Sequence, residues 1–292
     1  MAIPYKKVLT LGHSLALDAC HMLAGVVAAE GEQLEIVTLY DSGCPLFRHV
    51  EYLREGTRKY SLHVSSTETP GLPPKVIKEV TMEDAILYSD FDLIMMQGGT
   101  FEIAKSETYT DGNIQIIQDY VNQKKRDPDA VFAWHMPWAF ATDPDLMAMY
   151  PRTPNSYISR YKDYDTDRVR LYEAFCKCVT AHILPDDSFR FLIPTGTAME
   201  NAMSSCLTEK DLLHDYAHAS DLGRLLAAYT WYCVLAGVKE LKEMKMTTIP
   251  AALRRGNQTE DRQLTELERA VLLEALNNAL KTPLALTKSQ YV

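Results

Sequence analysis

Short apolar segments alternate along this chain with longer segments that repeat apolar residues at helical spacing, and this alternation is the strongest constraint on its fold. Buried strands are predicted for residues 5–11, 34–40, 91–97, 130–135 and 188–193. Helices are predicted for residues 17–30, 113–125, 167–184, 220–236 and 264–280. Strands that alternate with helices form parallel sheets through right-handed crossovers, with helices on both faces. The sequence therefore predicts a three-layer α/β/α sandwich around a five-stranded, mainly parallel sheet.

The remaining segments are less regular. Residues 59–64 and 75–80 flank a turn rich in proline and glycine and could pair as a hairpin. Residues 136–166 are interpreted as an inserted lid over one end of the sheet, because loops of this length in compact domains are usually binding loops. Residues 247–292 are expected to form a C-terminal helical extension. With 47% hydrophobic residues over 292 positions, we expect one domain spanning 1–292.

Charge and cysteine usage argue against several classes of function. A net charge of −9 and a pI near 5.4 leave no basic face that could neutralise the phosphates of a nucleic acid. No apolar run approaches the roughly 20 residues of a membrane span, and the first residues carry no export signal. The six cysteines are dispersed, as in proteins of a reducing compartment. We therefore expect a cytoplasmic protein that binds neither nucleic acid nor membrane.

Three polar or glycine positions follow three of the predicted strands. Ser14 follows the first strand, Gly43 the second and Gln97 the third. Ligands of parallel sheets bind beyond the carboxyl ends of the strands, so these residues should share one rim. Ser14 alone is ambiguous, because a serine after a strand is commonly the N-cap of the next helix.

A serine becomes a nucleophile only when a base takes its proton and a third group orients that base. Among the eight histidines, His218 is distinguished by Asp215, three residues earlier in a loop before a helix. At this spacing the carboxylate can accept a hydrogen bond from one ring nitrogen while the other faces outward. His13 is the neighbour of Ser14 but should point the other way if the backbone is extended there.

These segments resemble the SGNH, or GDSL-like, hydrolase superfamily. The Gly-Asp-Ser-Leu motif of that family is matched by G12-H13-S14-L15, its oxyanion glycine by S42-G43-C44, and its Asp-x-x-His by D215-Y216-A217-H218. The match runs closer to an uncharacterised bacterial branch, a domain of unknown function, with G-N-S-F-S-x-D near the start and D-G-x-H-L-S then G-R-Y-L-A-A near the end. Here those segments read G12-H13-S14-L15-A16-L17-D18, D215-Y216-A217-H218-A219-S220 and G223-R224-L225-L226-A227-A228.

The resemblance implies a flavodoxin-like fold and a serine esterase. Ser14 would be the nucleophile, His218 the base and Asp215 its orienting carboxylate. The amides of Ser14 and Gly43 would form the oxyanion hole with the side chain of Gln97. Two positions depart from the family: M96-Q97-G98-G99-T100 replaces Gly-x-Asn-Asp, so Gln97 substitutes for the asparagine donor, and Tyr216 stands where the branch usually has glycine.

The expected substrate is a small acyl ester, and the resemblance suggests O-acetyl groups on a carbohydrate. Aromatic residues in or beside the predicted lid would suit sugar rings, with His135 and Trp138 as candidate substrate contacts. Packing of the lid onto the sheet is an equally good interpretation of this group, which comprises Trp134, His135, Trp138, Tyr150 and Tyr157.

A second hypothesis is a non-catalytic ligand-binding module that keeps the fold without turnover, given the altered third motif and Tyr216. Nucleotide binding after the first strand is disfavoured, because G12-H13-S14-L15-A16-L17 lacks the glycines that let the backbone approach phosphates. No His, Asp or Glu cluster shows metal-ligand spacing, and no metal or cofactor is predicted. The sequence does not indicate the oligomeric state.

Overall fold

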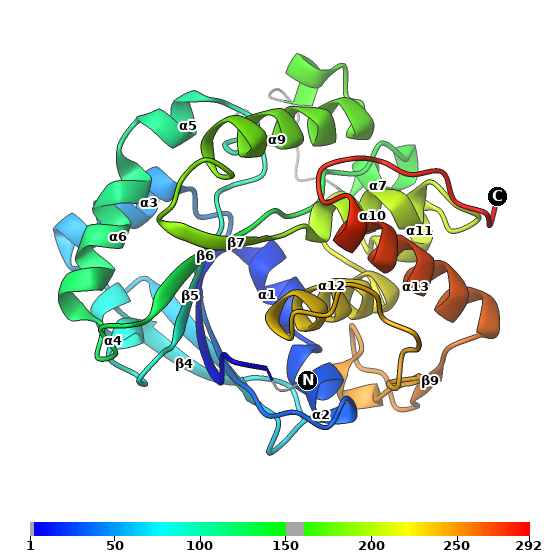
Figure 1. Ribbon diagram of the computed structural model, residues 1–292, viewed down its shortest axis with the longest axis horizontal. Helices are drawn as coiled ribbons and strands as arrows, with labels where there is room; N and C mark the ends of the chain where they lie inside the picture. Colours follow the sequence, from blue (N-terminus) through cyan, green and yellow to red (C-terminus); the bar gives the residue numbers. More distant parts are fainter. Residues whose placement is uncertain (1–2, 150–160) are drawn as a thin grey trace.

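The computed structural model describes residues 3–149 and 161–292. Within these residues the central sheet has seven strands in the order β4-β3-β2-β1-β5-β6-β7 (Figure 1). Its strands are β1 (Lys7–Gly12), β2 (Glu35–Tyr40), β3 (Tyr60–Ser66), β4 (Lys75–Val80), β5 (Leu93–Met96), β6 (Val131–His135) and β7 (Phe189–Ile193). A separate two-stranded sheet pairs β8 (Thr248–Ile249) with β9 (Arg262–Gln263).

The expectation of five strands is wrong, although all five predicted segments are strands. They form the parallel part of the sheet, β2-β1-β5-β6-β7. The predicted hairpin adds β3 and β4 to the β2 edge in antiparallel order. In β4, at the end of the sheet, Val80 is the one buried residue, so this strand lacks the apolar character that identifies strands in the interior.

Helices lie on both sides of the sheet. In Figure 1, α3, α4 and α6 lie on one side, and α1, α2 and α12 lie on the other. The α-helices are α1 (Ser14–Cys20), α2 (Leu23–Ala29), α3 (Leu46–Glu55), α4 (Met82–Ile86), α5 (Glu107–Thr110), α6 (Asn113–Lys124), α7 (Pro144–Ala148), α9 (Arg168–His182), α10 (Thr195–Met203), α11 (Glu209–Leu212), α12 (Asp221–Leu235) and α13 (Glu266–Lys281). The described residues also form the 3₁₀ turns η1 (Lys162–Tyr164) and η2 (Ala251–Leu253).

The single helix predicted for residues 17–30 is two helices. The chain turns at His21 and Met22, between α1 and α2. The ring of His21 reaches the backbone carbonyl oxygen of Leu253 at 3.1 Å, a contact between distant parts of the chain that local periodicity does not indicate. The C-terminal helix α13 packs on α10 and α12. Residues 247–292 also contain β8, η2 and β9 before that helix.

The segment after β6 begins inside the protein. Met136, Trp138, Ala139 and Ala141 are buried, and α7 follows them. This start of the predicted lid therefore contributes to the core. Its central part, residues 150–160, lies outside the described residues.

Candidate active site

A pocket opens where the carboxyl ends of the parallel strands meet, and loops that are distant in the sequence line it. Its volume is about 370 Å³, within the range of small-molecule sites. It is lined by His13, Ser14, Leu15, Ser42, Gly43, Pro45, Phe47, Arg48, Gly99, Thr100, Phe101, Glu102, Phe140, Tyr216, Ala217 and His218. Ser14, Gly43 and His218, predicted from three separate segments, thus share one pocket.

Ser14 is the first residue of α1 and is not its N-cap. The N-cap is His13, whose ring Nδ1 accepts a hydrogen bond from the Leu15 amide at 3.4 Å. No hydrogen bond joins the Ser14 hydroxyl to another residue in the described parts of the chain. The capping interpretation of Ser14 is therefore wrong, and its hydroxyl is not committed to the helix.

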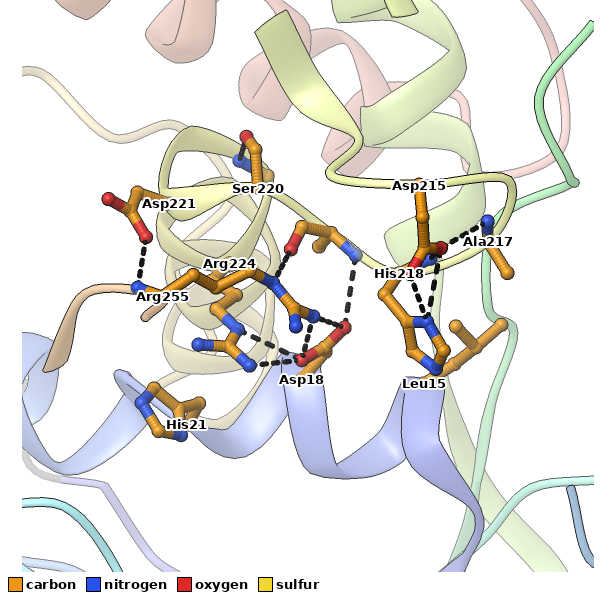
Figure 2. Close-up of polar contacts among 12 residues, drawn as sticks. Leu15, Asp18, His21, Asp215, Ala217, His218, Ser220, Asp221, Arg224 and Arg255 are labelled. Carbon is orange, nitrogen blue, oxygen red and sulfur yellow. Dashed lines mark hydrogen bonds and ion pairs between the residues drawn. The ribbon is translucent and has the colours of Figure 1, made fainter. Parts of the chain in front are cut away.

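His218 and Asp215 form the predicted pair. His218 Nδ1 lies 2.8 Å from Asp215 Oδ2 and 3.1 Å from Oδ1. Because a carboxylate only accepts, the proton belongs on Nδ1, which leaves a lone pair on Nε2. The ring points toward the first turn of α1 in Figure 2. Ser14 and His218 are not joined by a direct hydrogen bond in this structure.

The Asp215 carboxylate is held by the backbone of its own loop. Its Oδ1 accepts hydrogen bonds from the amides of Ala217 at 2.9 Å and His218 at 2.8 Å. Burial would raise the pKa of Asp215, but the hydrogen bonds from the His218 ring and from these amides outweigh it and lower the pKa to about 2. Asp215 is therefore an anion at neutral pH that keeps the imidazole in one orientation.

The loop around the pair is closed and supported from behind. The His214 amide donates to the His218 carbonyl at 2.7 Å. The indole Nε1 of Trp138 donates to the Ala217 carbonyl at 2.6 Å. Tyr216 packs edge-on against Phe140 with ring centroids 5.5 Å apart. The bulk of Tyr216 is accommodated by this contact, and the bond between Asp215 and His218 forms with Tyr216 in place.

A buried ionic cluster joins the loop to α1 (Figure 2). Asp18, one turn after Ser14, accepts a hydrogen bond from the Ala219 amide at 3.0 Å. Arg224 donates to Asp18 Oδ1 at 2.6 and 2.9 Å, and Arg255 donates to both carboxylate oxygens at 2.6 and 2.7 Å. The Asp18 side chain is 4% exposed. Asp18 therefore ties the helix that carries Ser14 to the residue that follows His218.

The pocket contains a second histidine, His13, which is not available as a base. Its Nε2 donates to the Gly98 carbonyl at 3.1 Å, while Nδ1 receives the Leu15 amide. Burial, opposed in part by the hydrogen bond to Gly98, lowers the pKa of His13 to about 4. Both ring nitrogens of His13 thus form hydrogen bonds. In His218 only Nδ1 does so, with the Asp215 carboxylate, in the described chain.

Gln97 does not line the pocket, contrary to the role predicted for it. Its side chain is fully buried beneath the end of β1, where its Oε1 would lie 2.9 Å from a Cβ placed on Gly12. Neither end of its amide has a hydrogen-bond partner among the described side chains and backbone. The pocket is lined instead by Gly99 and Thr100, two and three residues later. Thr100 is thus the residue with a side-chain hydroxyl that this loop contributes to the pocket lining.

His135 and Trp138 are not placed as substrate contacts. Both are 0% exposed and neither lines the pocket. His135 packs edge-on against Trp231, with ring centroids 5.0 Å apart, and Trp138 supports the loop through Ala217. Trp134 is also buried, which agrees with the packing interpretation for these three residues. Tyr150 and Tyr157 lie outside the described residues.

Three residues near the pocket were given no role from the sequence: Asp18, Arg224 and Arg255. Asp18 and Arg224 occur in the segments that resemble the bacterial branch, which is the signal that could have identified them. The contact of Asp18 with Arg255 spans 237 positions and has no local signature. In residues 3–149 and 161–292 no group of three His, Cys, Asp or Glu side chains is placed to hold a metal ion. No helix in those ranges has the length and apolar character needed to cross a membrane.

Comparison with known proteins identifies relatives of the whole fold. A family model described as "Domain of unknown function (DUF4886)" matches residues 7–252. A crystal structure of a DUF4886 family protein from Bacteroides uniformis superposes with a TM-score of 0.78, at 23% identity over 97% of both chains. No curated protein matches the sequence.

Two further structures are more distant. One is a protein from Slackia heliotrinireducens provisionally named an SGNH hydrolase, with a TM-score of 0.46 and 17% identity over 77% of this chain and 96% of that one. The other is LAE5, an alpha/beta hydrolase enzyme from the metagenome of Lake Arreo, with a TM-score of 0.45 and 10% identity over 82% of this chain and 97% of that one.

Proposed function

The chain belongs to the DUF4886 family, and we propose that it is a serine hydrolase of the SGNH type that cleaves a small acyl ester. One observation carries the proposal. The pocket is lined by a serine hydroxyl at the start of α1 that makes no hydrogen bond in the described chain, and by an imidazole that a half-buried carboxylate orients. This combination is what acyl transfer requires of a protein.

In the proposed mechanism, His218 Nε2 takes the proton of the Ser14 hydroxyl while Oγ attacks the ester carbonyl carbon. The tetrahedral intermediate collapses, and His218 returns the proton to the leaving alcohol oxygen. Water, deprotonated by the same imidazole, then attacks the acyl-enzyme and releases the acid and free Ser14. Proton transfer needs Ser14 Oγ and His218 Nε2 within about 3 Å, a contact that commonly tightens only in the substrate complex.

The oxyanion would be stabilised by the backbone amides of Ser14 and Gly43. Gly43 has a φ of 57°, in the left-handed region that favours glycine, and it lines the pocket beside Ser14. We assign the third donor to the Thr100 hydroxyl, because Gln97 is buried away from the pocket. Each such donor is worth roughly 3 kcal/mol of transition-state stabilisation.

The pocket suits a small ester with a polar alcohol part. Phe47, Phe101, Phe140 and Tyr216 give it aromatic walls. Aromatic faces next to polar edges accommodate sugar rings. An O-acetyl group on a carbohydrate is therefore our first candidate substrate.

The direct test is hydrolysis of p-nitrophenyl acetate and of acetylated sugars by purified protein. We expect turnover by the wild type and its loss in Ser14→Ala. Ser42→Ala is the matched control, because Ser42 lines the same pocket but follows β2. Equal rates for wild type and Ser14→Ala would contradict the proposal.

A non-catalytic ligand-binding module remains the second candidate. It is favoured by two observations: the amide of Gln97 is buried away from the pocket, and no hydrogen bond joins Ser14 to His218 in the described structure. Binding of an acyl ester without turnover, with the same affinity in wild type and Ser14→Ala, would select this alternative.

A further inference from the structure

One arginine in the pocket lining has no hydrogen-bond or ion-pair partner among the described residues. Arg48, on the first turn of α3, is half-buried and lies in the same cavity as Ser14 and His218. No hydrogen bond or ion pair joins its side chain to any residue that the structure describes. In contrast, Arg224 and Arg255 both pair with Asp18. The half-buried guanidinium of Arg48 therefore retains its full capacity to bind an anion.

The carboxylate in the pocket does not neutralise Arg48. Glu102 accepts hydrogen bonds from the amides of Leu46 at 2.9 and 3.0 Å and of Gly99 at 2.8 Å. These bonds tie Glu102 to the start of α3 and to the loop after β5. The Glu102 carboxylate therefore occupies the anion-binding position at the N-terminus of α3. An anionic ligand would bind the Arg48 guanidinium and not the backbone amides at the start of that helix.

Acids close to Arg48 in sequence do not pair with it. Glu51, three residues later on α3, is exposed and forms no ion pair with Arg48 within 4.0 Å in the described chain. Asp41 accepts a hydrogen bond from the Tyr52 hydroxyl at 3.3 Å and forms no ion pair with Arg48 within 4.0 Å in the described chain. The chain as a whole carries a net charge of −9. This net charge opposes the approach of an anionic ligand, and Arg48 supplies a local cation where the proposed chemistry takes place.

We propose that Arg48 binds a negatively charged group on the substrate, so that the preferred ester carries an anion on its acyl or its alcohol part. The inference rests on the proposed function, because it places the anion in the cavity of Ser14. Guanidinium is planar and donates two parallel hydrogen bonds to a carboxylate, sulfate or phosphate. Phe47, adjacent to Arg48 and 46% exposed, offers an apolar face to the carbon skeleton of the same ligand.

The test compares matched esters. Mono-p-nitrophenyl glutarate against p-nitrophenyl pentanoate places a carboxylate on the acyl part, and p-acetoxybenzoate against its methyl ester places one on the alcohol part. We expect the wild type to prefer the charged member of one pair. In Arg48→Ala and Arg48→Gln the ratio of kcat/KM for charged over neutral ester should fall about 10- to 100-fold, the range of a charged hydrogen bond.

Arg54→Ala is the control, because Arg54 lies on the same helix but does not line the pocket. We expect its charged-to-neutral ratio to match the wild type. The inference is overturned if the wild type shows no charge preference in either pair, or if Arg48→Ala lowers both members of a pair by the same factor.

A binding measurement separates this inference from the proposed function. If no ester is hydrolysed, calorimetry with glutarate on Ser14→Ala still tests the anion site. Binding that disappears in Ser14→Ala/Arg48→Ala supports it, whereas binding that is absent or unchanged by Arg48→Ala contradicts it.

Discussion

The two walls of the pocket differ in how their polar groups are held. On the wall that carries His218, Asp215, Ala217 and Ala219 all have hydrogen-bond partners, and Asp18 and Trp138 tie the loop to the core. On the wall formed by the segments after β2 and β5, Arg48 and Thr100 have no hydrogen-bond or ion-pair partner within the described ranges. Fixed geometry suits groups that transfer protons, and unpaired groups suit those that meet a ligand. The contrast assigns proton transfer to one wall, and contact with the bound ligand and its oxyanion to the other.

The largest expected effect is on the fixed wall. His218→Ala and Asp215→Asn should each reduce kcat for p-nitrophenyl acetate by about a thousandfold or more, because the base is lost or its tautomer is no longer held. Steady-state kinetics with far-UV circular dichroism checks this. His214→Ala, with an exposed ring in the same loop, should keep its activity. Full activity of either variant would remove that residue from the mechanism.

The next largest effect is expected at Asp18, which joins α1 to the loop that carries His218. Asp18→Asn removes the anion that two guanidinium groups share, and breaking such a buried pair costs about 3 to 5 kcal/mol. Urea unfolding should show this loss, accompanied by reduced kcat. Asp90→Asn is the comparison, because its ion pair with Arg126 is 3.8 Å long and exposed and is worth less than about 1 kcal/mol. Equal losses in the two variants would contradict the role given to Asp18.

Thr100 tests the wall whose polar groups have no partner, through its proposed contact with the oxyanion. Thr100→Val keeps the shape of the side chain and removes its hydroxyl, so kcat should fall about 100-fold while stability is unchanged. Gln97→Met keeps the size of a buried side chain that lies outside the pocket, and its kcat should stay close to that of the wild type. The opposite pattern would restore Gln97 as the oxyanion donor.

The smallest effect concerns His135, which belongs to neither wall. Burial, followed by the charge of His13, lowers its pKa from 6.5 to about 3. The His135 ring therefore binds a proton below pH 6.5 in the unfolded chain, but only below about pH 3 in the folded chain. This costs the wild type stability as the pH falls, at about 1.4 kcal/mol per pH unit.

His135→Phe removes that penalty. Urea unfolding should find the variant close to the wild type at pH 7.5 and more stable by about 2 kcal/mol at pH 5. Esterase activity at neutral pH should be retained, since the ring does not reach the pocket. A constant difference in the free energy of unfolding between the two pH values would show that His135 is not buried as a neutral ring.

The sequence predicted the parallel strands and the longer helices with a polar face, because both leave a local period. It missed α3, although this helix has one buried and one exposed face, and it missed α10, where all nine residues from Thr195 to Met203 are buried. Such a helix has no solvent-facing stripe. One of those residues is Glu200, whose pKa is raised to about 8 by burial although Arg168 pairs with it. A helix that buries a carboxylate against a distant arginine cannot be recognised from amphipathic spacing.

Local signals also decided which residues of the candidate site could be predicted. Ser14, Asp215 and His218 could be predicted because each lies in a short motif, G12-H13-S14-L15 or D215-Y216-A217-H218. Gln97 was misplaced because the side to which a strand-end residue points depends on its neighbours, here Gly12 and α1. His13 was expected to point away, yet it caps α1 and lines the pocket. The contacts of Asp18 span more than 200 positions and required the folded structure.

The most direct test of the account is the site of covalent labelling by a fluorophosphonate probe, located by peptide mass spectrometry. A serine activated by His218 should give one adduct, on Ser14, that is absent from Ser14→Ala and strongly reduced in His218→Ala. Labelling of another residue, or equal labelling of wild type and His218→Ala, would contradict the claim that these two side chains act together.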